Sequence, residues 1–253
     1  MKRIIMGGIT GHTGRAVAEC IESAADFHLV APVGQRSQGQ DIGQIFHGMK
    51  DGRIVYPDVR AALEVHDADC YVDFTTPQAA LRNLSDAVAG GVDVVVGTTG
   101  MDEHSLSELM ERVTEDMFVM IASNYSLGIM ALAQFSQRLA SLFGTDDMEI
   151  IETHNITKLD KPSGTALYLQ RKLSPVDPLV PIESRRIAAP ISRHEIFVHL
   201  DEQTLSFKHE VTDPSTFGCG VLYVLRHCAG KTGVYRDLAS FVDELGPLAL
   251  SGA

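Results

Sequence analysis

The sequence has no long apolar run: no segment reaches the roughly 18 consecutive apolar residues that a membrane-spanning helix needs. Residues 1–6 carry two basic side chains and a short apolar stretch, and glycine follows at once. A secretory signal needs a longer apolar region and a cleavage site. We therefore expect a cytoplasmic protein without membrane contact, and we interpret residues 3–6 as its first β-strand.

Cysteine is also scarce. The four cysteines are widely spaced and form no CxxC pair: Cys20, Cys70, Cys219 and Cys228. Isolated cysteines in a reducing compartment are usually small apolar core residues, and we expect that role here. No cluster of histidine and cysteine has the spacing of metal ligands, so we predict no metal site.

Positive charge is in short supply, since 21 Lys and Arg face 33 Asp and Glu and the formal net charge is −12. Nucleic acid binding requires a basic surface, so this balance argues against a nucleic acid partner. A small-molecule substrate fits better. If that substrate is anionic, it has to be held locally by backbone amides, helix N-termini and a few cations.

The first half of the chain contains short apolar runs that alternate with amphipathic helical patterns. This alternation predicts a parallel sheet covered by helices on both faces. The predicted strands are residues 3–6, 28–33, 70–74, 93–97 and 117–121. With 253 residues, of which 45% are hydrophobic, the chain is long enough for this domain and a second, smaller one.

The pattern changes after Gly128. A long helical pattern runs to about residue 143, and a strand at 148–153 leads into a polar loop. The remaining elements are antiparallel strands at 182–188, 195–200 and 204–211, and helices at about 217–229 and 235–245. We predict an α/β fold: a Rossmann-like parallel-sheet domain with an inserted α+β domain that contains an open mixed or antiparallel sheet. The dinucleotide-binding domain is residues 1–127, completed by 217–253, and the substrate-binding and oligomerisation domain is 128–216.

Glycines follow the first predicted strand with the spacing G-x-x-G-x-x-G, and a helix follows them. Such a loop brings backbone N–H groups close to a pyrophosphate at the helix N-terminus. The predicted cofactor-binding residues here are Gly8, Ile9, Thr10, Gly11, His12, Thr13 and Gly14. The alternative is a purely structural turn.

The end of the second predicted strand bears on which cofactor binds. An NAD site usually has Asp or Glu there, to bind the ribose 2′-hydroxyl. Residues 33–37 contain no carboxylate, whereas Arg36, with Ser37, suits a 2′-phosphate. This favours NADPH and leaves NADH possible. The alternative is a solvated loop arginine.

Two more predicted strands end in short polar motifs, at residues 97–100 and 122–125. Ligands of an open parallel sheet lie beyond the carboxyl ends of its strands. We therefore add to the predicted cofactor site Gly97, Thr98, Thr99, Ala122, Ser123, Asn124 and Tyr125.

The segment 152–166, ETHNITKLDKPSGTA, concentrates residues suited to chemistry. His154 exchanges protons near neutral pH, and Lys158 adds a positive charge four residues later. Residues 163–165 follow a proline and open a helical pattern, where exposed N–H groups suit a carboxylate. The alternative is a strand-end histidine, a surface lysine and an ordinary helix cap.

This segment and four others resemble the family of 4-hydroxy-tetrahydrodipicolinate reductases, also called dihydrodipicolinate reductases. The family pattern is approximately E-x-H-H-x-x-K-x-D-x-P-S-G-T-A. The other similar runs are 73–77 (DFTTP), 97–100 (GTTG), 124–128 (NYSLG) and 231–235 (KTGVY). The resemblance spans almost the whole chain. It implies hydride transfer from NAD(P)H to a cyclic unsaturated dicarboxylate in lysine and diaminopimelate biosynthesis, by a homotetramer assembled through the central domain.

Carried over by position, the resemblance makes His154 the proton donor and Lys158 the second catalytic residue. The implied substrate-binding residues are Asn155, Ser163, Gly164 and Thr165.

The chain also departs from the family pattern. Asn155 replaces the second histidine of the pair, and residues 192–194, SRH, replace a typical G-x-H turn. Other departures are His12 and Thr13 in the glycine loop, Met130, and Pro214, where a basic residue is usual. Three hypotheses follow: the family reaction, a similar reductase of a different cyclic imine in a specialised pathway, and a non-catalytic NADP(H)-binding protein.

Overall fold

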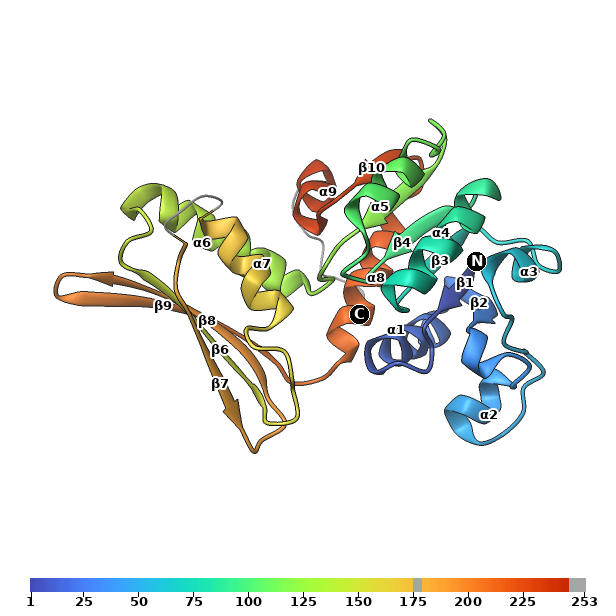
Figure 1. Ribbon diagram of the computed structural model, residues 1–253, viewed down its shortest axis with the longest axis horizontal. Coiled ribbons are helices and arrows are strands. Elements are labelled where there is room, and N and C mark those ends of the chain that lie inside the picture. Colours follow the sequence, from blue (N-terminus) through green and yellow to red (C-terminus); the bar gives the residue numbers. More distant parts are fainter. Residues whose placement is uncertain (175–178, 246–253) are drawn as a thin grey trace. The chain divides into compact units, whose positions relative to one another are not determined.

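The computed structural model describes residues 1–174 and 179–245, whose contacts divide the chain into two compact units (Figure 1). The first unit contains residues 1–125 and the chain from residue 217 onward, and the second contains residues 126–216. The last part of the predicted first domain, residues 246–253, lies outside the described residues. Within the described ranges, no helix combines the length and apolar character needed to span a membrane.

The first unit is built on a six-stranded sheet in the order β10-β5-β4-β3-β1-β2, and every neighbouring pair is parallel. Its strands are β1 (Lys2–Gly7), β2 (Phe27–Val33), β3 (Cys70–Asp73), β4 (Asp93–Val96), β5 (Phe118–Ile121) and β10 (Gly233–Tyr235). Successive residues such as Ile4 and Ile5 are both fully buried. Both faces of the sheet are therefore covered, and the predicted Rossmann-like parallel sheet is confirmed.

Helices and short turns connect these strands. They are α1 (His12–Ser23), the 3-10 turn η1 (Gln35–Ser37), α2 (Ile42–His47), α3 (Val59–Leu63), α4 (Pro77–Ala89), α5 (Glu103–Met110), α8 (Ser215–His227) and α9 (Leu238–Leu245). In α4, Pro77 starts the helix, where its missing N–H costs nothing, and Leu84 and Val88 face the sheet. They belong to the same apolar core as Val94 and Val96 of β4, so the apolar stripe of the helix fixes its place on the sheet.

The second unit has a four-stranded sheet in the order β7-β6-β8-β9. Its elements are α6 (Leu127–Phe143), β6 (Met148–Asn155), α7 (Gly164–Leu173), β7 (Ile182–Ile187), β8 (Ser192–Leu200) and β9 (Gln203–Val211). Helices α6 and α7 lie side by side on one face of this sheet (Figure 1). The sheet is mixed, as one of the two predicted options had it.

Three details of the sequence-based prediction are wrong. Strand β7 runs parallel to β6 and not antiparallel, because α7 intervenes and returns the chain for a parallel crossover. The predicted helix at 235–245 begins only at Leu238, since residues 233–235 pair with β5 as an edge strand that periodicity does not reveal. The cysteines are all free, but Cys219 is exposed and is not the core residue we expected.

One face of the second sheet changes character along its strands. Under the helices, Ile150, Ile196 and Val198 form an apolar core with Ile129 and Leu169. Because strand side chains alternate, the next residues of β6 on this face are Glu152 and His154, which are also buried. We call this part of the face, residues Glu152, His154, Arg186, Ser192 and His194, the polar end of the sheet.

Candidate active site

The glycine loop between β1 and α1 packs against the end of β3. Gly8 has φ +87°, and a Cβ at this position would overlap the carbonyl oxygen of Phe74. A Cβ at Gly14 would in turn overlap the carbonyl oxygen of Gly8. The N-cap of α1, Gly11, gives no side-chain hydrogen bond to the helix, so the first amides of α1 have no capping side chain. The loop is thus shaped for close approach of an anion to backbone N–H groups.

The loop lies at the switch point of the first sheet. From β1 the chain moves to β2 on one side, and β3 then lies on the other side of β1. Ligands of doubly wound sheets bind in the crevice beyond the strand ends at such a point. The predicted glycine loop and Thr98 do converge here, because Thr98 donates its hydroxyl to Asp73 at the end of β3, at 2.5 Å.

Asp73 is a site residue that the sequence did not single out. It is fully buried and accepts hydrogen bonds from the backbone N–H of Thr75 at 2.9 Å and from its hydroxyl. The Tyr71 hydroxyl also donates to Asp73 and accepts from the Asn83 amide at 2.9 Å. Burial raises the pKa of Tyr71, and the Asp73 charge adds to the effect. The signal available in the sequence was a carboxylate at the end of an apolar strand, in the run 73–77 (DFTTP).

The motif at 122–125 contributes mainly backbone. The N–H of Ala122 donates to the Val96 carbonyl, and the buried Tyr125 gives its hydroxyl to the same carbonyl at 2.9 Å. The Tyr125 side chain is therefore part of the core. The Ser123 side chain is exposed, and Asn124 is half-buried.

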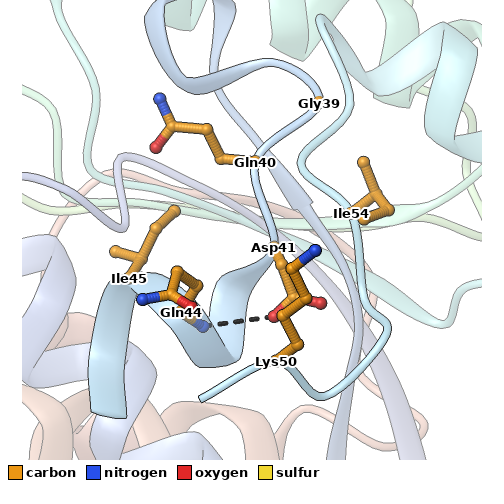
Figure 2. A pocket seen from close by; sticks show the side chains of 7 residues that line it. All are labelled: Gly39, Gln40, Asp41, Gln44, Ile45, Lys50 and Ile54. Carbon is orange, nitrogen blue, oxygen red and sulfur yellow. Dashed lines mark hydrogen bonds between the residues drawn. The ribbon is translucent and has the colours of Figure 1, made fainter. Parts of the chain in front are cut away.

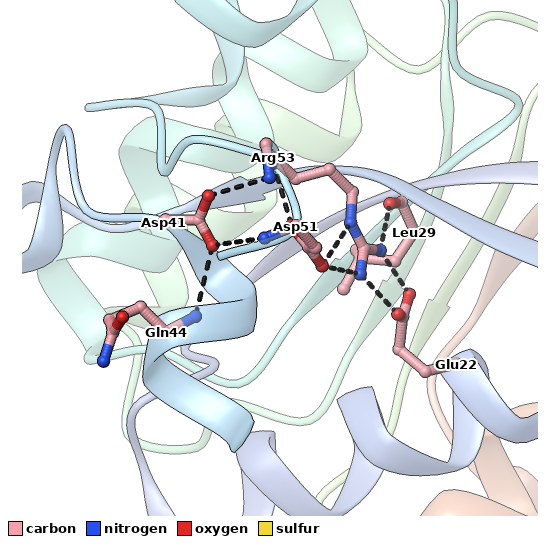
Figure 3. A network of polar contacts seen from close by, with 7 residues as sticks. Glu22, Leu29, Asp41, Gln44, Asp51 and Arg53 are labelled. Carbon is pink, nitrogen blue, oxygen red and sulfur yellow. Dashed lines mark hydrogen bonds and ion pairs between the residues drawn. The ribbon is translucent and has the colours of Figure 1, made fainter. Parts of the chain in front are cut away.

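Arg36 lies on η1 and is exposed, with no hydrogen bond or ion pair to any residue in the described part of the chain. The segment that follows it is braced (Figure 3). Arg53 binds Glu22 at 2.6 Å and also binds Asp51 and the Leu29 carbonyl. Asp41 caps α2 and accepts backbone N–H groups of Gln44, Asp51 and Gly52.

A hollow of about 420 Å³ opens in the same segment (Figure 2). Its lining residues are Gly39, Gln40, Asp41, Gln44, Ile45, Lys50 and Ile54. None of the predicted cofactor residues lines the hollow, so it is not the predicted dinucleotide site.

In the second unit, His154 occupies the polar end of the sheet. It is 7% exposed, and its Nδ1 is hydrogen-bonded to the carboxylate of Glu152, which is fully buried. Arg186 donates to the other oxygen of Glu152 at 2.9 Å. Burial lowers the pKa of His154, and the charges of Lys158 and Arg186 add to this against the opposing effect of Glu152. His154 is therefore neutral at neutral pH.

His194 lies beside His154, with the ring centroids 5.1 Å apart in an edge-on arrangement. Its Nε2 is 3.1 Å from the hydroxyl of Ser163, which caps α7 by accepting from the Ala166 N–H. Burial, with a smaller contribution from His154, lowers the pKa of His194 to about 3. His194 was noted in the sequence only as part of a departure from a motif, and the strand register needed to place it was not predictable.

Lys158 lies in the loop that connects β6 to α7, and Gly164 is the first residue of α7. The Lys158 ammonium is 2.9 Å from the carboxylate of Asp160. Burial raises the pKa of Asp160, but the hydrogen bond and charge of Lys158, with backbone N–H groups that include Gly164, outweigh it and lower the pKa overall. Asp160 thus occupies the position between Lys158 and Gly164 that the sequence suggested for a substrate carboxylate. Thr165, beside Gly164, is half-buried.

Asn155 is engaged within the loop. Its amide donates to the Ala189 carbonyl at 2.9 Å, and its carbonyl accepts both the N–H and the hydroxyl of Thr157. The structure therefore gives Asn155 a part in shaping the turn.

The donor atoms of Glu152, His154 and His194 lie within 4.8 Å of one another, close enough to consider a metal ion. However, the Glu152 carboxylate is already paired with Arg186 and His154. A divalent cation would be placed beside a guanidinium. The arrangement is therefore better suited to holding a proton than a metal.

The comparisons of sequence agree on one family. The family model for the N-terminus of dihydrodipicolinate reductase matches residues 2–125, and the model for its C-terminus matches residues 128–240. The chain is 32% identical to a 4-hydroxy-tetrahydrodipicolinate reductase of Desulfitobacterium hafniense, over 95% of this chain and 98% of that protein. It is 31% identical to one of Haloarcula marismortui, over 96% of this chain and 100% of that protein.

Among solved structures, a dipicolinate-bound dihydrodipicolinate reductase from Paenisporosarcina sp. TG-14 has a TM-score of 0.82 at 22% identity, covering 95% of this chain and 99% of that chain. A myo-inositol dehydrogenase from Corynebacterium glutamicum has a TM-score of 0.65 at 13% identity, covering 97% and 93%. At these identities the similarity establishes the fold alone.

Proposed function

The chain belongs to the dihydrodipicolinate reductase family, and from this premise we propose how its residues perform the reaction. It is an NAD(P)H-dependent oxidoreductase of lysine and diaminopimelate biosynthesis, with 4-hydroxy-tetrahydrodipicolinate as its substrate. The observation that carries the assignment of residues is the buried pair of His154 and Glu152, followed by Lys158 and the N-terminus of α7. The first unit is the dinucleotide-binding domain, and the second is the substrate domain.

The cofactor, when bound, supplies a hydride to the substrate. The fit of the first unit to a dinucleotide rests on the glycine loop, whose close backbone contacts leave no room for a Cβ at Gly8 or Gly14. Hydride addition to a conjugated cyclic imine leaves electron density that a proton must quench. His154 supplies that proton, because it is the histidine of the polar end that is hydrogen-bonded to Glu152, and this contact favours its charged form.

Lys158 and the start of α7 bind the substrate carboxylates. A dianionic substrate adds negative charge near His154 and raises its pKa, so substrate binding itself prepares the proton donor. Lys158 offsets the charge on the substrate. Ser163, Gly164 and Thr165 present the N-terminus of α7 to the second charge.

We propose NADPH as the preferred cofactor. Support comes from Arg36 beyond β2, which is exposed and has no partner among the described residues. It lies on a segment that the Arg53 and Asp41 contacts hold in place. Charge-assisted contacts make Arg36→Ala weaken NADPH binding on the order of 10- to 100-fold and NADH binding much less. Titration of both cofactors checks this, and equal losses would remove Arg36 from the site.

We also propose a cytoplasmic homotetramer assembled through the second sheet. The outer strands β7 and β9 leave open edges, and such edges need a partner or protection. Light scattering tests the proposal, and a monomer mass that does not change with concentration argues against it.

A second candidate is a reductase of the same mechanism that acts on another cyclic imine. The loop role of Asn155 favours it, because the second histidine of the family pattern is absent. The deciding experiment is complementation of a strain that lacks the lysine-pathway reductase, with His154→Ala as the inactive control. Growth supports the family reaction. If there is no growth, and the purified protein does not oxidise NADPH or NADH with 4-hydroxy-tetrahydrodipicolinate, the second candidate takes its place. Restoring the histidine with Asn155→His then tells whether the pocket was relaxed or rebuilt.

A further inference from the structure

The polar end of the second sheet contains a continuous hydrogen-bonded row across three strands. In the strand register, His154 of β6 faces Arg186 on β7 and Ser192 on β8. Arg186 donates to Glu152 at 2.9 Å, Glu152 is bonded to Nδ1 of His154, and Nε2 of His154 is 3.1 Å from the Ser192 hydroxyl. The row therefore runs from Arg186 through Glu152 and His154 to Ser192.

The hydrogen-bond partners of His154 determine which of its ring nitrogens carries the hydrogen. Burial raises the pKa of Glu152, but its hydrogen bonds with Arg186 and His154 lower it overall, so Glu152 is an ionised acceptor. Nδ1 of His154 must then carry the hydrogen. Nε2 of the neutral ring is left as an acceptor, and the Ser192 hydroxyl donates to it.

The other groups that face His154 do not compete with Ser192 as a proton path. Lys158 and Arg186 are positively charged, and the Glu152 carboxylate is hydrogen-bonded to Nδ1 of His154 and to Arg186. His194 packs against the ring, but with a pKa of about 3 it holds no extra proton to give at neutral pH. Among the residues that the structure describes, Ser192 is the hydrogen-bond partner of Nε2.

We propose that Ser192 is a proton-relay residue of the reductase reaction. In the protonated state of His154, Nε2–H passes its proton to the Ser192 oxygen while the Ser192 hydroxyl proton passes to the electron-rich substrate. The substrate gains one proton, His154 loses one, and Ser192 is unchanged. This rests on the proposed function. The relay departs from the typical family pattern, which has glycine, with no hydroxyl, at the position of Ser192.

The test uses three variants of the full chain. Ser192→Ala removes the hydroxyl, Ser192→Thr keeps it on a strand-compatible side chain, and Ser206→Ala removes an exposed hydroxyl from β9 of the same sheet. We expect Ser192→Ala to lower kcat about 10- to 100-fold, since a displaced proton transfer loses part of a general-acid effect. Ser192→Thr keeps most of kcat, and Ser206→Ala leaves it unchanged.

Two further readouts separate a relay from a structural role. In mixtures of light and heavy water, the wild type should show a curved dependence of kcat on deuterium content, because two protons move, and Ser192→Ala should show a linear one. Nitrogen-15 spectra of histidine-labelled protein without substrate should show His154 protonated at Nδ1. If Ser192→Ala does not fold, Ser192→Gly, which restores the family pattern, replaces it.

The outcomes separate a failure of the Ser192 relay from a failure of the proposed function. An active wild type whose Ser192→Ala variant keeps the same kcat and the same isotope dependence overturns the relay alone. The Nε2-protonated form of His154 in the free protein overturns it as well. A wild type that reduces nothing with either cofactor, while its spectra show the expected proton on Nδ1, overturns the proposed function and the relay with it.

Discussion

Among the residues that the structure describes, each of the two units buries one carboxylate completely, and the two are held in different ways. Asp73 at the end of β3 accepts hydrogen bonds from hydroxyls and a backbone N–H, all neutral donors. Glu152 on β6 is paired with the Arg186 guanidinium and with His154, whose charge changes with protonation. The neutral donors around Asp73 hold its carboxylate in place without coupling it to a titrating side chain. A carboxylate beside an imidazole is instead coupled to a proton, as the proposed role of His154 requires.

The largest expected effect on kcat comes from removing His154, the imidazole partner that Glu152 has and Asp73 lacks. His154→Ala should lower kcat about 10²–10⁴-fold, because the proton donor is lost. NADPH affinity should remain near the wild-type value. Steady-state kinetics and cofactor titration measure both. Full turnover by a folded variant would end the role of His154.

The two carboxylates are compared directly by Glu152→Gln and Asp73→Asn. Each change leaves buried partners unmatched, and each should lower the free energy of unfolding by about 3 kcal/mol. Only Glu152→Gln should move the pH profile of kcat/KM. Glu152 raises the pKa of His154, so its removal shifts the loss of protonated His154, and with it the fall in activity as pH rises, to lower pH. A pH profile that moves equally in both variants would contradict the comparison.

Acid should weaken the polar end of the second sheet. The pKa of His194 is about 3 in the folded chain, below the ordinary 6.5. Between these values the unfolded chain binds a proton that the folded chain does not, so stability is lost as pH falls below 6.5. The loss is on the order of 2 kcal/mol at pH 5. Denaturant unfolding at pH 7.5 and 5 measures it. His194→Gln should flatten the dependence, and the same change at exposed His104 should not.

Asp160 extends the comparison to a carboxylate near the surface. It pairs with Lys158, and both side chains are partly exposed. A substrate carboxylate has to displace it, so Asp160→Asn should lower KM about two- to fivefold, the range of an exposed ion pair, without changing kcat. Saturation kinetics measure this small effect. A higher KM would show that Asp160 orders the loop for the substrate.

Much of this organisation could be predicted from the sequence. Apolar runs such as residues 93–97 define buried strands, and the glycine spacing after β1 places the switch-point loop. The partners of His154 could not be predicted in the same way. Arg186 and Ser192 are 32 and 38 residues from it, and they meet it only through strand register and the parallel direction of β7. Asn155 shows a second limit of prediction from sequence. It lies in the segment that resembles the family pattern, but its side chain hydrogen-bonds within a turn.

The pairing register of β6 with β8 also limits which changes in chain length evolution can accept here. Residues 188–191 lead into β8, whose Ser192 and His194 share the buried face while Arg193 points away. One residue inserted here and absorbed by a slip of β8 would place Ile191 opposite His154 and Arg193 opposite Glu152, and it would turn Ser192 and His194 outward. Two inserted residues would restore the alternation but displace the pairs. Lineages of this chain should therefore tolerate substitutions in this connection far better than insertions or deletions.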